Sequence, residues 1–356
     1  MLAGGAEPEY LRRHSECLSD LVDPVTNPDG YIALCEAENR LVAEMIADRL
    51  DRVPRVPATV LGYDTMTGAL QFREQLARFM GRTFLDREFD PRQISVLAGA
   101  GSVLEILFHA LGDPGDGVLV PTPSYAGFWM DLELRNGLTI VPAHRSSDDD
   151  FRLSPEVLYR AAAGAARPVK ALLYTSPDNP LGTVASPEEI KMVLAWAEDR
   201  DLHVIFDEIY ALSVFGDRAF TSCAKVLPSL GERVHIVWAF SKDFGASGLR
   251  CGVLVSENPA VNAAVDALAY WACCSGHTQH VLVAVGFYSD RSEQEVIASL
   301  SGELDRKHRL VSAQGIERLA TQSLSHYRFR HILFQKYLYG SLDPVERAHL
   351  HEQVGT

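Results

Sequence analysis

The length of 356 residues predicts one large and one smaller domain. With 47% hydrophobic and 22% charged residues, the composition is typical of a soluble globular protein. Its 33 Lys and Arg residues stand against 47 Asp and Glu residues, and the net charge of −14 disfavours nucleic acid and anionic membranes as partners. The six cysteines form no CxxC pair, the histidines form no HExxH motif, and no apolar run approaches roughly twenty residues. We therefore expect no metal site, no signal peptide, no membrane span and a reducing, cytoplasmic location.

Apolar runs alternate with helical patterns along most of the chain. Residues 1–60 are interpreted as a polar N-terminal arm with one amphipathic helix, Asn39–Leu50. The remainder predicts an α/β fold with a mostly parallel sheet sandwiched by helices. The candidate strands are Ile94–Ala98, Gly117–Val120, Ala171–Thr175, His203–Phe206, His235–Ala239 and Cys251–Val255. The candidate helices among them include Leu104–Ala110 and Pro187–Asp199, the second with Ser186 as its N-cap.

The ends of these strands are where a site is expected, because ligands of open α/β sheets bind beyond the carboxyl ends of the strands. Lys242 follows one apolar strand and Asp207 directly follows another. Taken alone, each has an ordinary interpretation, as a surface lysine or a solvated strand end. The strand-end segments to consider are Gly99–Ser102, Pro123–Tyr125, Ser176–Gly182, Asp207–Tyr210 and Ser241–Arg250.

Together, the strand-end residues match one chemical requirement. Pyridoxal 5′-phosphate (PLP) chemistry needs an amine for a Schiff base and an acid that keeps the pyridine nitrogen protonated. It also needs cationic and backbone donors for the phosphate. Lys242, Asp207 and Arg250 have the side chains for these three tasks.

Three blocks, SPDNPLGT, FDEIY and SKDFGASGLR, resemble the signature motifs of fold-type I PLP enzymes, the aspartate aminotransferase superfamily. Within it, the likeness is closest to 1-aminocyclopropane-1-carboxylate (ACC) synthases and the related class I and II aminotransferases. NPDGYIALCEAENRL, GALQFREQLARFMGRTF and PTPSYAGFWMDLELRNG carry that second likeness. The resemblance covers roughly residues 20–300. It implies the PLP-dependent transferase-like fold, with a mostly parallel sheet of the seven-stranded type.

The resemblance implies roles for individual residues. Lys242 would form the internal aldimine and shuttle a proton at the substrate α-carbon, with Asp207 and Tyr210 completing the catalytic set. Asp207 would pair with the pyridinium nitrogen, and Tyr210 and Asn179 would hold the phenolic oxygen of the ring. Glu38 and Asn179 would lie near the substrate. The other cofactor-binding residues implied are Ala100, Gly101, Ser102, Ser241 and Arg250 around the phosphate, Tyr125 on the ring face, and Tyr63 as the tyrosine that reaches a neighbouring subunit's phosphate.

The implied activity is that of a PLP enzyme acting at the α-carbon of an amino acid. It is either an aminotransferase, with a 2-oxo acid as second substrate, or an ACC-synthase-like carbon–sulfur lyase, with S-adenosylmethionine as a candidate substrate. The resemblance also implies a homodimer. The alternative is a catalytically impaired PLP-binding protein, or a regulatory or fusion remnant.

The C-terminal part departs from the family. We expect a large PLP-binding domain over residues 61–290 and an incomplete or atypical helical segment over residues 291–356, in place of the small C-terminal domain. The likeness fades after a helical stretch near Glu293–Leu310. The last forty or so residues instead resemble a segment of ATPase-bearing transcriptional regulators, through RHILFQKYLY and ERAHLHE. Arg328 and Arg330 are candidates to replace the family's carboxylate-binding arginine.

Ala239 is a second departure, because the family usually carries a serine there that binds phosphate. A lost hydrogen bond to a charged group costs roughly 1–2 kcal/mol. We predict that Ala239→Ser binds PLP more tightly than the parent chain, measured as the PLP-loaded fraction at a fixed cofactor concentration. Equal loading of the two proteins would contradict this interpretation.

Overall fold

The structure is a computed structural model that describes residues 9–33, 37–39, 43–51, 53, 55–214, 219–284, 311–319 and 322–329. Its internal contacts divide the chain into two compact units. The first comprises Met1–Arg40 and Pro54–Ala284, so the N-terminal arm belongs with the large part of the chain. The second comprises Leu41–Val53 and Val285–Thr356.

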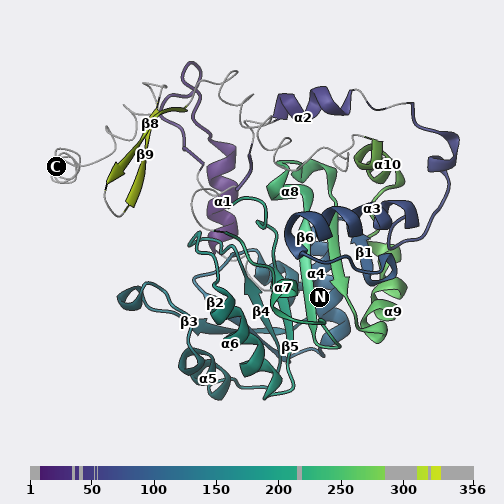
Figure 1. The fold of residues 1–356 in the computed structure, drawn as a ribbon, viewed down its shortest axis with the longest axis vertical. Coiled ribbons are helices and arrows are strands. Elements are labelled where there is room, and N and C mark those ends of the chain that lie inside the picture. The colour runs from purple at the N-terminus through teal and green to yellow at the C-terminus, as the bar shows by residue number, and fades with distance from the viewer. Residues whose placement is uncertain are drawn as a thin grey trace. The chain divides into compact units, whose positions relative to one another are not determined.

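A seven-stranded sheet forms the centre of the first unit (Figure 1). The strand order is β1-β7-β6-β5-β4-β2-β3. Strand β7 runs antiparallel to both of its neighbours, and the other pairs are parallel. This confirms the α/β fold with a mostly parallel sheet. The strands are β1 Ile94–Leu97, β2 Gly117–Thr122, β3 Thr139–His144, β4 Val169–Thr175, β5 His203–Asp207, β6 Val234–Ala239 and β7 Gly252–Ser256.

Burial explains which strands could be found from sequence. Every residue of β1, β6 and β7 is buried, which produces the continuous apolar runs expected of strands covered on both faces. Strand β3 was missed, because it buries only two residues and contains Pro142. It lies at the sheet edge, where a proline without an N–H group is tolerated.

Helices cover both faces of this sheet (Figure 1). On one face, α4 packs against alternate strand residues such as Leu173, Ile205, Val237 and Leu254, together with α9. The helices of the first unit are α1 Glu9–Ser19, α3 Leu70–Met80, α4 Ala100–Leu111, α5 Pro155–Ala163, α6 Pro187–Glu198, α7 Cys223–Val226, α8 Phe240–Asp243, α9 Pro259–Leu268 and α10 Gly276–Ala284. Short helical turns are η2 Ala58–Leu61, η3 Gly81–Leu85, η4 Pro91–Gln93, η5 Met130–Leu134, η6 Ser147–Asp149, η7 Ser247–Leu249 and η8 Ala269–Trp271.

An aromatic cluster fills the region beside Trp238 of β6, a residue with no exposed surface. Its ring lies 4.9 Å from that of Phe240, 5.6 Å from Phe84 and 5.9 Å from Phe79. The cluster therefore joins α3 and η3 to the turn that carries Lys242. Rings of this size contribute much of the apolar area of a core.

Of two predicted helices, one differs from the sequence interpretation at its first residue and the other agrees with it. Helix α4 begins at Ala100 and not at Leu104, because Gly99 ends the preceding strand segment with a φ of +95° and its C=O accepts the first helical hydrogen bond, from Val103. Helix α6 begins at Pro187 with Ser186 as its N-cap, as predicted. The Ser186 hydroxyl accepts a hydrogen bond from the Glu189 N–H at 3.1 Å.

Helix α1 within the arm was not expected, because it lacks a strong apolar stripe. Four ion pairs between residues three or four positions apart support it, including Arg12 to Glu16 at 2.5 Å. Such pairs stabilise exposed polar helices by a few tenths of a kcal/mol each. No helix among the described residues is long and apolar enough to cross a membrane.

The second unit contains α2, Ala43–Leu50, and a hairpin of β8, Val311–Leu319, with β9, Gln322–Phe329. Helix α2 begins at Ala43 and Asn39 is not helical, whereas residues 40–42, also within the helix predicted from Asn39, lie outside the described residues. The hairpin corrects the expectation of a helical segment for these residues. Tyr327 and Phe329 alternate with polar residues, the period of a strand. Arg328 lies in β9, whereas Arg330 and the predicted helical stretch Glu293–Leu310 lie outside the described residues.

Candidate active site

The predicted site residues gather at one edge of the sheet, where the parallel strands end. Lys242 follows β6, Asp207 is the last residue of β5, and Asn179 follows β4. Arg250 precedes a strand instead of following one. Because β7 is antiparallel to β6, its beginning lies at the edge where β6 ends, and Arg250 joins the same group.

Lys242 lies in the short helix α8, directly beyond the buried end of β6. Its ammonium donates a hydrogen bond to the backbone oxygen of Ala37 at 2.8 Å. Next to it, the Ser247 hydroxyl donates to a carboxylate oxygen of Glu38 at 2.5 Å. Two hydrogen bonds thus hold the N-terminal arm against the lysine, although more than two hundred residues separate them in the sequence.

Asp207 is a buried carboxyl, with 6% of its surface exposed. Burial raises its pKa to about 7. A hydrogen bond from the Ile209 N–H and the charge of Lys242 act in the opposite direction, whereas the charge of Asp131 raises the pKa further. A cation brought against this carboxylate would gain more than one brought to a solvated acid, because the local dielectric is low.

Tyr210 and Asn179 meet beside Asp207. The Asn179 amide donates a hydrogen bond to the Tyr210 hydroxyl at 3.4 Å. Burial, followed by the charge of Asp207, raises the pKa of Tyr210 to about 12, so the phenol keeps its proton at neutral pH. A hollow of about 430 Å3 opens here, lined by both side chains together with Pro177, Ser213 and Val214.

The start of α4 and Arg250 form a compact polar cradle. The Arg250 guanidinium donates to the backbone oxygens of Ala98 at 3.2 Å and Ser247 at 3.1 Å. A Cβ at Gly99 would lie 2.8 Å from the guanidinium carbon. A Cβ at Gly252 would lie 2.6 Å from the backbone nitrogen of Ala100. Only glycine at both positions allows the guanidinium and the first N–H groups of α4 to approach each other.

This cradle has the chemistry of an anion site. A helix start offers backbone donors and a positive dipole end, and the guanidinium adds a fixed charge. Ala100, Gly101 and Ser102 form the first turn of α4, where the sequence predicted phosphate binding. The Ser102 hydroxyl donates to the Ala98 oxygen at 3.2 Å.

The remaining predicted residues differ from one another in burial and in position. Tyr125 is 46% exposed and packs edge-on against Phe128, with ring centroids 5.4 Å apart. Ser241 is buried within α8. Ala239 is fully buried at the end of β6, opposite Gly252 in the register and so beside the start of α4. Tyr63 is 98% exposed, in the loop after η2.

Asp243 is an organising residue that the sequence analysis missed. Its carboxylate accepts hydrogen bonds from the Trp238 indole at 2.8 Å, the Ser213 hydroxyl at 2.7 Å and the Leu212 N–H at 3.1 Å. It therefore ties the segment after Tyr210 to the helix that carries Lys242. Its position directly after Lys242 was the available signal, but adjacency in sequence does not reveal its three partners.

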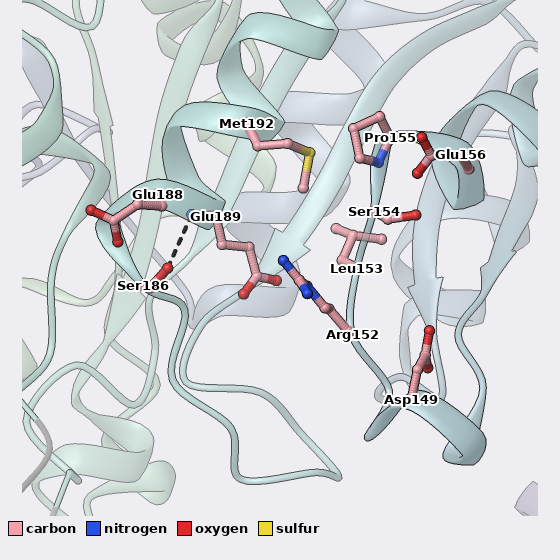
Figure 2. Close-up of a pocket in the computed structure, with 10 residues that line it drawn as sticks. All are labelled: Asp149, Arg152, Leu153, Ser154, Pro155, Glu156, Ser186, Glu188, Glu189 and Met192. Atoms are coloured by element: carbon pink, nitrogen blue, oxygen red, sulfur yellow. Dashed lines mark hydrogen bonds between the residues drawn. The ribbon is translucent and has the colours of Figure 1, made fainter.

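A separate cavity of about 550 Å3 lies between the starts of α5 and α6 (Figure 2). None of the predicted site residues lines it. In Figure 2 the Arg152 side chain points toward Glu189, whose carboxylate also accepts a hydrogen bond from the buried Tyr174 hydroxyl at 2.7 Å. The cavity carries one cation among four acids and so differs in character from the cradle at α4.

Comparison with known proteins agrees with this arrangement. The model of the aminotransferase class I and II family matches residues 33–323. Among curated proteins, the chain is 34% identical over 277 residues to 1-aminocyclopropane-1-carboxylate synthase 6 of Arabidopsis thaliana, covering 73% of this chain and 56% of that protein. It is 31% identical over 329 residues to 1-aminocyclopropane-1-carboxylate synthase 5 of the same plant, covering 86% of this chain and 70% of that one.

Solved structures give the same result. An aromatic aminotransferase from Pyrococcus horikoshii OT3 matches with a TM-score of 0.62 and 25% identity, over 77% of this chain and 70% of that one. An aspartate aminotransferase from Thermus thermophilus, solved with maleate, matches with a TM-score of 0.63 and 23% identity, over 85% and 72%. This second likeness concerns the fold alone.

The chain belongs to the aminotransferase class I and II family. The fold-type I resemblance and the PLP cofactor expected from it are confirmed. The family match runs to residue 323, beyond the recognisable motifs, which end near residue 300. The chain spans a little over half the length of the first curated relatives it matches.

Gly99 offers a test of the cradle. We predict that Gly99→Ala lowers PLP affinity by about tenfold or more, because the new methyl group displaces the guanidinium of Arg250 and removes a charge-assisted contact. Equilibrium titration with PLP, followed by absorbance, measures the effect.

Gly231→Ala is the matched control for Gly99→Ala. Gly231 also has a positive φ, +63°, but no atom lies within 4 Å of its added Cβ. This variant should lose about 1 kcal/mol of unfolding free energy from backbone strain and keep its PLP affinity. Equal loss of affinity in both variants would mean that strain, and not the Arg250 contact, is responsible.

Proposed function

We propose that this chain is a PLP-dependent enzyme that acts at the α-carbon of an amino acid, as an aminotransferase or as an ACC-synthase-like lyase. One observation carries the proposal. A lysine amine, a buried carboxyl and a guanidinium beside a helix start converge on one edge of the sheet, from strands β5, β6 and β7. Family membership supports the same activity.

The residues present fit the cofactor in three places. The cradle at α4 suits a phosphate, because Arg250 and the first N–H groups of the helix are free of bulky neighbours at Gly99 and Gly252. The buried Asp207 suits a cationic ring nitrogen. The Asn179–Tyr210 pair suits a phenolic oxygen, since both groups are hydrogen-bond donors. PLP, when bound, supplies an electron sink that stabilises negative charge at the substrate α-carbon.

Each of three side chains then has its own role in the proposed reaction. Lys242 provides the amine that holds the cofactor, and the same nitrogen carries a proton to and from the α-carbon. Asp207 holds a proton on the ring nitrogen, because a buried carboxylate gains most from a cationic partner. Tyr210 keeps its own proton at neutral pH and so donates, and does not accept, at the oxygen it faces.

Substrate contacts are assigned to the arm and to the loop after β4. Glu38 lies within one hydrogen bond of the turn that follows Lys242, and Asn179 lines the hollow beside Tyr210. We propose both as substrate-binding residues. The amino-acid substrate is S-adenosylmethionine for the lyase, or an amino acid paired with a 2-oxo acid for the aminotransferase.

Other residues complete the proposed cofactor site. Tyr125 covers the ring face, and Ser102 and Ser241 assist at the phosphate. Tyr63 extends from the loop after η2 with 98% of its surface exposed, which suits a side chain that reaches a second copy's site in a homodimer. Residues 61–290 form the proposed PLP-binding domain, and residues 291–356 replace the family's small domain.

The proposed location is cytoplasmic. The described cysteines are free thiols, namely Cys17, Cys223, Cys251, Cys273 and Cys274. Thiols left unpaired are typical of a reducing compartment.

Lys242→Ala tests the cofactor anchor. The parent chain with PLP should give a yellow chromophore that borohydride traps on Lys242, detected by mass spectrometry of the digested protein. The variant should lose both the chromophore and the trapped peptide, because no other amine follows a strand at this edge among the described residues.

Lys170→Ala is the control for the anchor. Lys170 is exposed at the beginning of β4, at the opposite end of the sheet from the site. This variant should behave like the parent. Trapping on another lysine, or an unchanged chromophore in Lys242→Ala, would contradict the assignment.

Product analysis separates the two proposed reactions. The lyase should release ACC from S-adenosylmethionine without a second substrate. The aminotransferase should exchange an amino group between an amino acid and a 2-oxo acid, and it should do so without forming ACC. Neither product, from a chain that still traps PLP on Lys242, would mean that the protein binds the cofactor without turnover.

A further inference from the structure

Asp131 lies against the first turn of α4, on the short turn η5. One of its carboxylate oxygens is 3.0 Å from the position that a Cβ on Gly101 would occupy. The Gly101 N–H is one of the donors at the start of α4. A carboxylate therefore lies next to the place where the proposed function puts the phosphate of PLP.

The Asp131 carboxylate accepts no hydrogen bond from any of the described residues, which is unusual for an acid that is mostly buried. Burial, followed by the charge of Glu105, raises its pKa to about 6. It is thus partly protonated near neutral pH, unlike a solvated aspartate.

Charged groups surround Asp131 on the side of α4 and η5. Glu105 of α4 is the acid whose charge raises the pKa of Asp131, and it is paired with Arg135 at 2.9 Å. Glu133 of the same turn accepts a hydrogen bond from the next strand, at the Ile140 N–H. None of these groups offers Asp131 a cation of its own, since Arg135 is engaged by Glu105.

On the other side lie the groups of the candidate site. Asp131 raises the pKa of Tyr125 and of Asp207. Arg250 lowers the pKa of Tyr125, and Lys242 lowers that of Asp207. Asp131 therefore belongs electrostatically to the same site as the proposed ring-stacking and ring-nitrogen residues.

We propose that Asp131 is a cofactor-binding residue that contacts the phosphate, and that its carboxyl carries a proton whenever the phosphate occupies the start of α4. This inference rests on the proposed function. A phosphate brings nearly two negative charges to a helix start that already has a carboxylate beside it. Two anions at one helix start repel each other, and the proton on Asp131 removes that repulsion and leaves a hydroxyl that donates to the phosphate.

The sign of the pH dependence follows from linkage. Asp131 must take up a proton when PLP binds, so its contribution to affinity is fully present below pH 6 and is lost as the pH rises. Asp131→Asn keeps the shape and a donor but cannot ionise. Its PLP affinity should exceed that of the parent on the order of ten- to a hundredfold at pH 8 and equal it at pH 5.5. The ratio of the two affinities cancels the titration of the cofactor, and the comparison with pyridoxal separates any effect that acts through Asp207.

The measurement is equilibrium titration of the full chain with PLP at pH 5.5, 7 and 8, repeated with pyridoxal, which lacks the phosphate. The gain in Asp131→Asn should appear with PLP and be absent with pyridoxal. Asp113→Asn is the matched control, since it removes the same charge from an exposed position before β2, at the opposite edge of the sheet. Calorimetry in two buffers that differ in ionisation enthalpy should show proton uptake by the parent at pH 7, and less by Asp131→Asn.

Each outcome decides the question. Unchanged or weaker PLP binding by Asp131→Asn at pH 8 overturns the inference while leaving the proposed function intact, provided that the parent traps PLP on Lys242. An equal gain with pyridoxal assigns the effect to the ring and also overturns it. Binding of neither ligand by the parent is a failure of the proposed function itself. If the variant does not fold, the proton uptake of the parent with PLP in excess of its uptake with pyridoxal still tests the proposal, and the absence of that excess contradicts it.

Discussion

The close approach of two chain segments, the start of α4 and the start of β7, is the constraint on which the site depends. Gly99 and Gly252 are the residues that permit it, because a methyl group at either would collide with Arg250 or with the first N–H of the helix. Only then do a guanidinium and a set of helix-start donors face the same small volume. Antiparallel β7 is what brings Arg250 to this edge, since in a parallel strand the residue before the strand would lie at the far end of the sheet.

Burial of acids is the second theme of this edge. Asp207, Asp131, Asp243 and Glu208 all have raised pKa values, in each case chiefly because burial penalises the charged form. The four acids differ in how the cost of burying their charge is offset. Asp243 and Glu208 accept hydrogen bonds from within the chain, so they organise the fold. Asp207 accepts one hydrogen bond, from the Ile209 N–H, and the Asp131 carboxylate accepts none from the described residues. Both therefore remain available to a cofactor, Asp207 as a carboxylate and Asp131, in our proposal, as a protonated carboxyl. An acid that organises the fold thus differs from one that serves the site in how many hydrogen bonds groups of the protein itself donate to its carboxylate.

Burial decided which strands and helices could be predicted from the sequence. Strands covered on both faces, such as β6 and β7, appear in the sequence as continuous apolar runs and were found. Edge strand β3 and polar helix α1 were missed, because neither needs a long apolar run. For the residues of the β8–β9 hairpin the sequence predicts a helical segment, since short stretches with mixed apolar and polar residues fit both periods.

In the candidate site too, some features follow from the sequence and others only from the tertiary structure. By itself, the sequence determined the chemical types of the site residues and their order along the chain. Lys242, Asp207 and Asn179 lie where strands end, and Arg250 lies just before a strand begins. Short motifs carry this information, because the local backbone alone places a residue next to a strand terminus. The tertiary structure decided which distant residues join them. Ala37 and Glu38 meet the turn of Lys242 across two hundred residues, and Asp131 meets Gly101 across thirty. It also decided their charge states, because a pKa depends on burial and on neighbouring charges, and both exist only once the chain has folded.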